Sequence, residues 1–234
     1  MDRAKKSGLV LKKTTKKKIT TVREHPMHVP VSDKNPSGIT IRDQHFRRLP
    51  GTYLKREEIS ETFKNYSRKG ITYPSSGKIL EHKDSDKYDD LIAVWVHYFN
   101  DKLKSDPPLA PDVFKALLAS ESGFHLDTPK NKIAFGIAQI TKQTWEILQD
   151  QNGEAKEFIF NEIRQKDLKN PDIAIPMSIR WLIYKSQRAA AKLGRQPDHE
   201  EIILEYKGLL KSKSKYKDNA LESFRKYYGQ LKNK

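Results

Sequence analysis

Residues 111–145 read PDVFKALLASESGFHLDTPKNKIAFGIAQITKQTW, and this stretch decides the fold. Pro111 suits the first position of a helix, because its missing N–H would have no partner there. Apolar residues then recur at helical spacing, at Val113, Phe114, Leu117 and Leu118. The pattern predicts a helix over 111–122, with Glu121 in its last turn where a loop begins.

Glu121 stands at the head of a stretch that holds little negative charge. After Asp127 no Asp or Glu occurs until Glu146. The apolar residues of this stretch are Phe124, Ile133, Phe135 and Ile137. An apolar wall without a neighbouring anion raises the pKa of a carboxyl group, because the charged form loses hydration. We therefore expect Glu121 to be neutral in the resting protein and to act as a single acid.

Residues 136–141, GIAQIT, bring uncharged polar groups after the loop. Gly136 allows a close approach of the backbone. The amide of Gln139 can both donate and accept hydrogen bonds. These residues, together with Ser122 and Thr141, are the candidates to surround Glu121.

The order of these blocks resembles the lysozyme-like lytic transglycosylases. That family has Glu-Ser, a short loop, a Gly-Ala pair and then Gly-Leu-Met-Gln, and this chain has Glu121-Ser122, Ala134 and residues 136–139 at the same spacing. Two weaker blocks follow in the family's order, at residues 170–184 and 204–228. The second block includes Tyr206, at the position of the family's active-site tyrosine. The resemblance covers about residues 86–228.

The resemblance implies a mainly α, lysozyme-like domain over residues 86–234. It also implies cleavage of the bond between N-acetylmuramic acid and N-acetylglucosamine in peptidoglycan, with formation of a 1,6-anhydro ring. Glu121 would act first as the acid and then as the base. Gln139 and Tyr206 would position the sugar and stabilise the transition state, with Ser122, Gly136 and Thr141 beside them. No metal or cofactor is expected.

The chain departs from the family at four positions. They are Ile133 for glycine, Ala138 for methionine, Ala174 for asparagine and Lys207 for the asparagine after the tyrosine. One alternative is therefore a wall-binding module of a phage or secretion machine that has lost catalysis. Another is a hydrolytic lysozyme, which needs a second carboxylate; Asp127 is the candidate.

Charge and composition limit the possible partners and chemistry. The chain has 234 residues, of which 36% are hydrophobic and 32% charged, and a formal net charge of +15. Such a charge attracts anionic polymers, including cell-wall polymers and nucleic acids. A nucleic-acid-binding protein is therefore a further alternative, but no nucleic-acid-binding motif accompanies the charge, so no specific nucleic acid is expected. The absence of cysteine excludes disulfides, thiol catalysis and thiolate metal sites.

The N-terminal part differs in composition from the rest. Residues 1–24 are rich in lysine and predict a basic flexible arm. Residues 25–84 are interrupted by prolines and predict a docking or delivery segment, with one helix near 53–68 and a boundary near Asp84. Residues 1–84 would contact a secretion-machine component or an immunity (inhibitor) protein.

The sequence contains no signal-peptide core and no apolar run long enough to span a membrane. We therefore expect synthesis in the cytoplasm and action in the periplasm or cell wall after delivery by a dedicated secretion or phage-type machine. The expected role is that of a secreted or injected bacterial effector that degrades peptidoglycan glycan strands.

Beyond 111–122, helices are expected at residues 86–103, 141–150, 173–193, 199–210 and 217–231, with Trp95 and Trp181 in the core.

Overall fold

The computed structural model describes residues 19–22, 25–28, 31, 36, 39–42, 45–48, 52–126, 133–212 and 216–233. The chain divides into two compact units, Met1–Pro50 and Gly51–Lys234. Most of the predicted basic arm lies outside the described residues. Asp127, the second carboxylate of the hydrolase alternative, also lies outside them.

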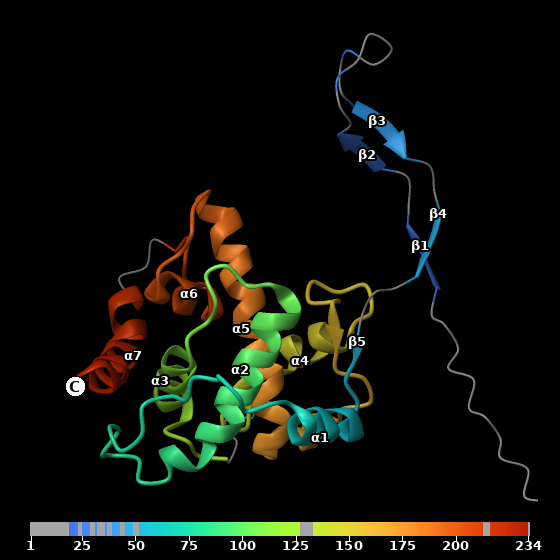
Figure 1. Ribbon diagram of the computed structural model, residues 1–234. Coiled ribbons are helices and arrows are strands. Elements are labelled where there is room, and N and C mark those ends of the chain that lie inside the picture. Colours follow the sequence, from blue (N-terminus) through green and yellow to red (C-terminus); the bar gives the residue numbers. More distant parts are fainter. Residues whose placement is uncertain are drawn as a thin grey trace, which may run out of the picture. The chain divides into compact units, whose positions relative to one another are not determined.

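The described residues of the first unit form two antiparallel pairs of short strands (Figure 1). Strand β1 (Ile19–Val22) pairs with β4 (His45–Arg48), and β2 (His25–His28) pairs with β3 (Ile39–Arg42). The end of the predicted flexible arm is instead a strand, since β1 reads Ile-Thr-Thr-Val and β-branched residues favour strands.

Helices make up most of the second unit, which confirms the mainly α prediction. In the described residues they are α1 (Arg56–Asn65), α2 (Asp89–Leu103), α3 (Pro111–Ser122), α4 (Lys142–Gln149), α5 (Pro171–Leu193), α6 (His199–Tyr206) and α7 (Tyr216–Lys232). Short 3-10 turns lie at Ser85–Tyr88 and Gln165–Lys169. Four two-residue strands complete the unit: β5 (Thr52–Tyr53) is parallel to β8 (Phe158–Ile159), and β6 (Ala134–Phe135) is antiparallel to β7 (Ile140–Thr141).

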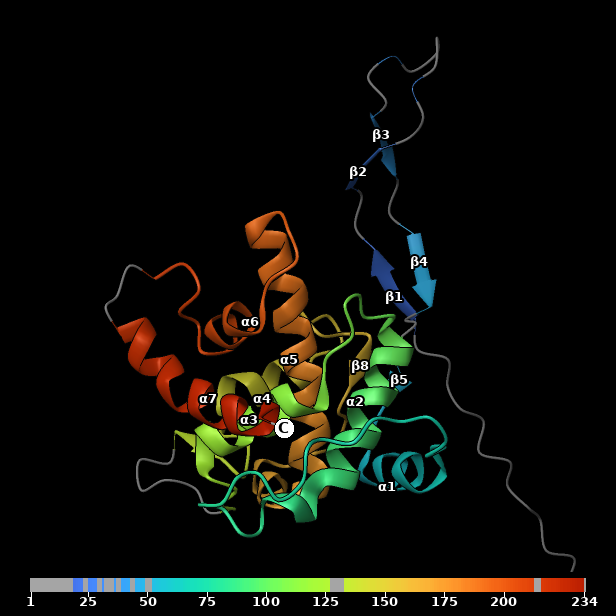
Figure 2. The same ribbon diagram turned by 60° about the vertical axis from the view of Figure 1, so that its left-hand side comes forward.

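Helices α2 and α5 form the centre of the second unit (Figures 1 and 2). They pack on each other, and α5 also contacts α1, α4 and α6. One stripe of α2 is buried; it consists of Leu91, Val94, Trp95, Tyr98 and Phe99. Ile92, Ala93 and Val96 are fully buried as well, so α2 is covered on more than the one face that an amphipathic pattern indicates. Trp181 of α5 lies in the core, as predicted.

The second unit begins at Gly51, although the sequence placed the boundary near Asp84. The amide N–H groups of Thr52 and Leu54 donate to the carbonyl oxygens of Glu157 and Ile159, at 2.9 and 2.8 Å. Leu54 is also buried in the core. Residues 52–84 therefore pack as part of the helical unit, because strand pairing and apolar burial outweigh their polar, proline-containing composition.

A buried lysine fixes the end of this segment. Lys115 of α3 is fully buried, and its ammonium group lies 2.6 Å from Asp86 Oδ1 and 2.7 Å from Asp89 Oδ1. It also donates to the carbonyl oxygen of Ser75 at 2.9 Å. Because a buried charge is costly without partners, these contacts hold residues 75–89 against α3.

Helix α3 packs against both α2 and α7, and its last turn carries Glu121 (Figure 2). The apolar residues of α7 that recur at helical spacing are buried at Leu221, Phe224 and Leu231, whereas Tyr228 is partly buried. Among the described residues, no helix has both the length and the apolar character needed to cross a membrane.

Candidate functional site

Helix α3 ends immediately after Glu121 and Ser122 for a local reason. Gly123 adopts a left-handed conformation, with φ of +58°, and its N–H donates to the Ala119 carbonyl oxygen at 3.1 Å. A Cβ atom at this position would lie 2.6 Å from Cε1 of His82. Glycine therefore both terminates the helix and admits the neighbouring imidazole. Glu121 is left in the final turn, as the sequence predicted.

The turn between β6 and β7 lies at residues 136–139. Gly136 has φ of +68°, and a Cβ atom on it would lie 1.9 Å from the carbonyl oxygen of Leu168. Gln139 also has a positive φ, of +49°, and its side-chain amide donates to the Gly136 carbonyl oxygen at 2.9 Å. The close approach predicted for Gly136 is therefore made by the protein's own backbone.

Three segments that are distant in sequence meet at this turn. Ser122 Oγ donates to the carbonyl oxygen of Ile137 at 2.6 Å. The phenol of Tyr206, at the end of α6, donates to the carbonyl oxygen of Ala138 at 3.1 Å. The ends of α3 and α6 are thus both tied to the turn that carries Gln139.

Glu121 forms an ion pair with Lys207, the residue that follows α6. The Glu121 side chain is 16% exposed and the Lys207 side chain is 21% exposed, so water screens the pair only in part. The expectation of a solitary acid therefore needs correction, because it considered neighbouring anions and left out the ammonium group of Lys207, which contacts the acid in space.

Tyr206 is influenced by the same charges. Burial raises the pKa of its phenol, and the negative charge of Glu121 raises it further. The phenol therefore stays protonated and remains a hydrogen-bond donor at physiological pH.

The apolar wall expected around Glu121 is only partly present. Phe124 and Ile137 are buried and Phe135 is partly buried, but Ile133 is 63% exposed. Thr141 has a structural role, since it caps α4 by accepting a 3.2 Å hydrogen bond from the Thr144 N–H. Among the predicted site residues, the structure brings together Glu121, Ser122, Gly136, Gln139 and Tyr206, with Thr141 two residues past the turn.

Lys207 was not among the predicted site residues, although the sequence contained a signal. It directly follows Tyr206, and it replaces the asparagine of the resembled family with a cation. Helix α6, expected to reach residue 210, ends at Tyr206, and Gly208 then adopts a φ of +73°. Lys207 consequently caps the helix, and its side chain reaches the end of α3.

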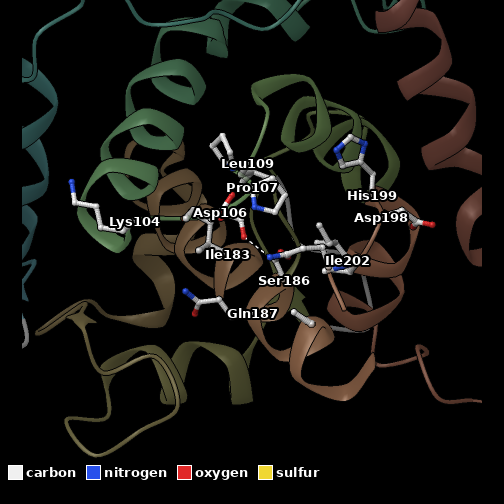
Figure 3. Close-up of a pocket in the computed structure, with 15 residues that line it drawn as sticks. Lys104, Asp106, Pro107, Leu109, Ile183, Ser186, Gln187, Asp198, His199 and Ile202 are labelled. Carbon is white, nitrogen blue, oxygen red and sulfur yellow. Dashed lines mark hydrogen bonds between the residues drawn. The ribbon is translucent and has the colours of Figure 1, made fainter. Parts of the chain in front are cut away.

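A separate cavity of about 440 Å³ lies at the opposite end of α6 (Figure 3). It is bordered by residues 104–109, by α5 around Ile183 and Ser186, and by the start of α6 at His199 and Ile202. The Gln196 amide donates to the Asp106 carbonyl oxygen at 2.8 Å across its edge. None of the predicted site residues lines this cavity.

Comparison with models of known protein families gives no match, and comparison with curated proteins gives none either.

Proposed function

We propose that the protein is a peptidoglycan lytic transglycosylase with Glu121 as its single catalytic acid and base. One observation carries the proposal: the acid at the end of α3, the turn with Gln139 and the phenol of Tyr206 are joined by hydrogen bonds through Ser122 and through Tyr206 itself. This set matches, residue by residue, the blocks through which the chain resembles that family.

The proposed reaction needs one proton to move twice. Glu121 in its acid form gives its proton to the oxygen that joins the muramic C1 to the next sugar, and that C1–O bond breaks. The resulting carboxylate removes the proton from the muramic C6 hydroxyl, whose oxygen closes a bond to C1. Water is not consumed, and the products are a 1,6-anhydro end and a free hydroxyl. Acid-base catalysis of this kind contributes roughly 10²–10⁴-fold to a rate.

Gln139 and Tyr206 would position the sugar for both steps. The Tyr206 phenol already donates to Ala138, so its place relative to the turn is fixed. The phenol also stays protonated near the negative Glu121, because burial and that charge both raise its pKa. Its one O–H donates to the Ala138 carbonyl oxygen, so the phenol oxygen can accept a hydrogen bond from a sugar hydroxyl.

Mass analysis of muropeptides tests this proposal. The full chain is incubated with purified peptidoglycan, and the ends of the released strands are identified. A transglycosylase leaves anhydro ends, whereas a hydrolase leaves reducing ends heavier by one water. Glu121→Gln should abolish release, and Glu222→Gln, which alters an exposed carboxylate on α7, should not. Retained anhydro product in Glu121→Gln would refute the assignment.

The Glu121–Lys207 ion pair also supports the alternative of a wall-binding module, because the ammonium group occupies an oxygen of the proposed acid. A binding module would sediment with insoluble peptidoglycan and release no fragments. Reducing ends in the products would instead indicate the hydrolytic alternative.

We further propose that the protein acts on the wall as a delivered effector, with the unit Met1–Pro50 in contact with a delivery machine or an inhibitor protein. The full chain would be produced in a bacterium with and without a fused export signal. Lysis should occur only with export and should disappear with Glu121→Gln. Lysis without export, or lysis by the variant, would count against this role.

A further inference from the structure

Lys207 joins two elements at the proposed site. Its backbone N–H donates to the Ile203 carbonyl oxygen at 2.9 Å, which fixes the residue at the end of α6. Its ammonium group contacts Glu121 Oε1 at the end of α3. The two side chains are 21% and 16% exposed, so the pair is shielded but retains a path to solvent.

Lys207 differs from two other shielded lysines of the second unit. Lys115 has three oxygen partners, and Lys192 lies 2.7 Å from both carboxylate oxygens of Glu205. Those lysines hold elements together through several contacts. Lys207 instead contacts one oxygen of the residue that must be protonated for the proposed reaction, which makes the pair an obstacle to catalysis.

The obstacle is removed if another carboxylate takes the ammonium group. The muramic unit of peptidoglycan carries such a group, either its own lactyl carboxylate in peptide-free strands or a carboxylate of the attached peptide. The charges balance in this exchange: the substrate carboxylate pairs with Lys207, and the shielded Glu121 carboxylate takes one proton from solvent. Glu121 then has the form that donates to the glycosidic oxygen.

We propose that Lys207 is a positioning and specificity residue, which pairs with Glu121 until a carboxylate on the muramic unit draws the ammonium group away. The proposal rests on the proposed function. It predicts that the enzyme becomes active only on strands that carry a carboxylate close to the scissile bond.

Binding to the uncleaved strand tests the exchange apart from catalysis. Glu121→Gln cannot cleave, and its Lys207 lacks the Glu121 carboxylate. Three probes are used: peptide-free strands, the same strands with the lactyl carboxylate converted to its amide, and strands that keep their peptides. Glu121→Gln should bind a carboxylate strand roughly tenfold more tightly than the amide strand, as for a charge-assisted hydrogen bond. The preference should vanish in Glu121→Gln/Lys207→Met. Whether it appears with peptide-free or with peptide-bearing strands identifies the source of the carboxylate.

Kinetics provide the second test, because Lys207→Met should impair the reaction on one substrate and speed it on another. On carboxylate strands, Lys207→Met should raise KM, since the anion loses its partner. On the amide strands, Lys207→Met should have a higher kcat than the unaltered protein, because Glu121 is no longer held by a cation. Lys207→Arg should restore the preference for carboxylate strands. Lys211→Met removes an exposed positive charge four residues away and should change neither value.

The outcomes separate this inference from the proposed function. If the unaltered protein produces anhydro ends but Glu121→Gln shows no carboxylate preference, the role of Lys207 is wrong and the transglycosylase assignment stands. If Lys207→Met lowers activity equally on both substrates, its role is structural and the inference fails. If the unaltered protein cleaves no strand, the proposed function fails, and the binding assay alone decides whether Lys207 recognises the carboxylate.

Discussion

The hydroxyl of Ser122 donates a 2.6 Å hydrogen bond to the carbonyl oxygen of Ile137. This bond joins the last turn of α3, which carries Glu121, to the turn that carries Gln139. Ile137 is fully buried, so its carbonyl oxygen has few alternatives to this donor. This bond is therefore one of the contacts that fix the acid relative to the turn.

Ser122→Ala should destabilise the fold by about 1–2 kcal/mol, because the Ile137 carbonyl oxygen loses a partner inside the protein. Release of peptidoglycan fragments should fall by more than the loss of folded protein explains. Urea unfolding and muropeptide release measure the two effects. The control is Ser120→Ala, because Ser120 Oγ donates at 2.9 Å to Leu117 within the same helix. Equal losses of activity in both variants would show that the bond to the turn has no special role.

Gly136→Ala should destabilise the fold by more than the positive φ angle of residue 136 alone explains. The added Cβ atom would lie 1.9 Å from the Leu168 carbonyl oxygen, which is backbone and cannot rotate away. Gly194→Ala is the matched control, since Gly194 has a nearly equal φ of +69° and nothing within 4 Å of the added atom. We expect Gly194→Ala to lower the free energy of unfolding by about 1 kcal/mol. Gly136→Ala should lower it several times as much. Thermal unfolding that ranks the two variants equally would contradict the close approach.

Tyr206→Phe should leave the fold intact and reduce cleavage of peptidoglycan. The variant loses one hydrogen bond, to the Ala138 carbonyl oxygen, at a cost of about 1 kcal/mol. It also removes the hydroxyl that would contact the sugar. Tyr228→Phe is the control, because its phenol bonds His199 Nδ1 at 3.0 Å at the other end of α6. Activity should survive in that variant, and full activity in Tyr206→Phe would exclude a role for the phenol.

The free energy of unfolding should fall at acid pH, in part because Glu81 becomes protonated. An ion pair with Lys226 of α7, at 2.8 Å, lowers the pKa of Glu81 from its ordinary value of 4.5 to about 2. A carboxyl group whose pKa is lower in the folded state stabilises the fold above the unfolded pKa. That contribution is lost as the pH falls from about 4.5 towards 2.

Glu81→Gln should therefore lower the urea midpoint near neutral pH and have no effect at about pH 2. Asp84→Asn removes a more exposed carboxylate in the same segment and controls for the change in net charge. An effect of Glu81→Gln that is the same at both pH values would contradict the pairing with Lys226.

Much of the helical structure was predictable because its signals are local. Pro111 and Gly123 set the two ends of α3, and the apolar residues of α2 and α7 recur at helical spacing. The boundary at Gly51 was not predictable in this way. It depends on β5 pairing with β8, about a hundred residues further along the chain, and no local pattern marks such a partner.

The candidate site shows the same division. The sequence by itself determined that Glu121 ends a helix and that a glycine precedes Gln139 in a tight turn, since helix ends and positive φ angles are properties of a few adjacent residues. Only the tertiary structure decided that Lys207 reaches Glu121, because the ends of α3 and α6 meet across 86 residues of sequence. Whether the acid is alone or paired depends on that meeting, since an ion pair requires contact in space rather than proximity along the chain.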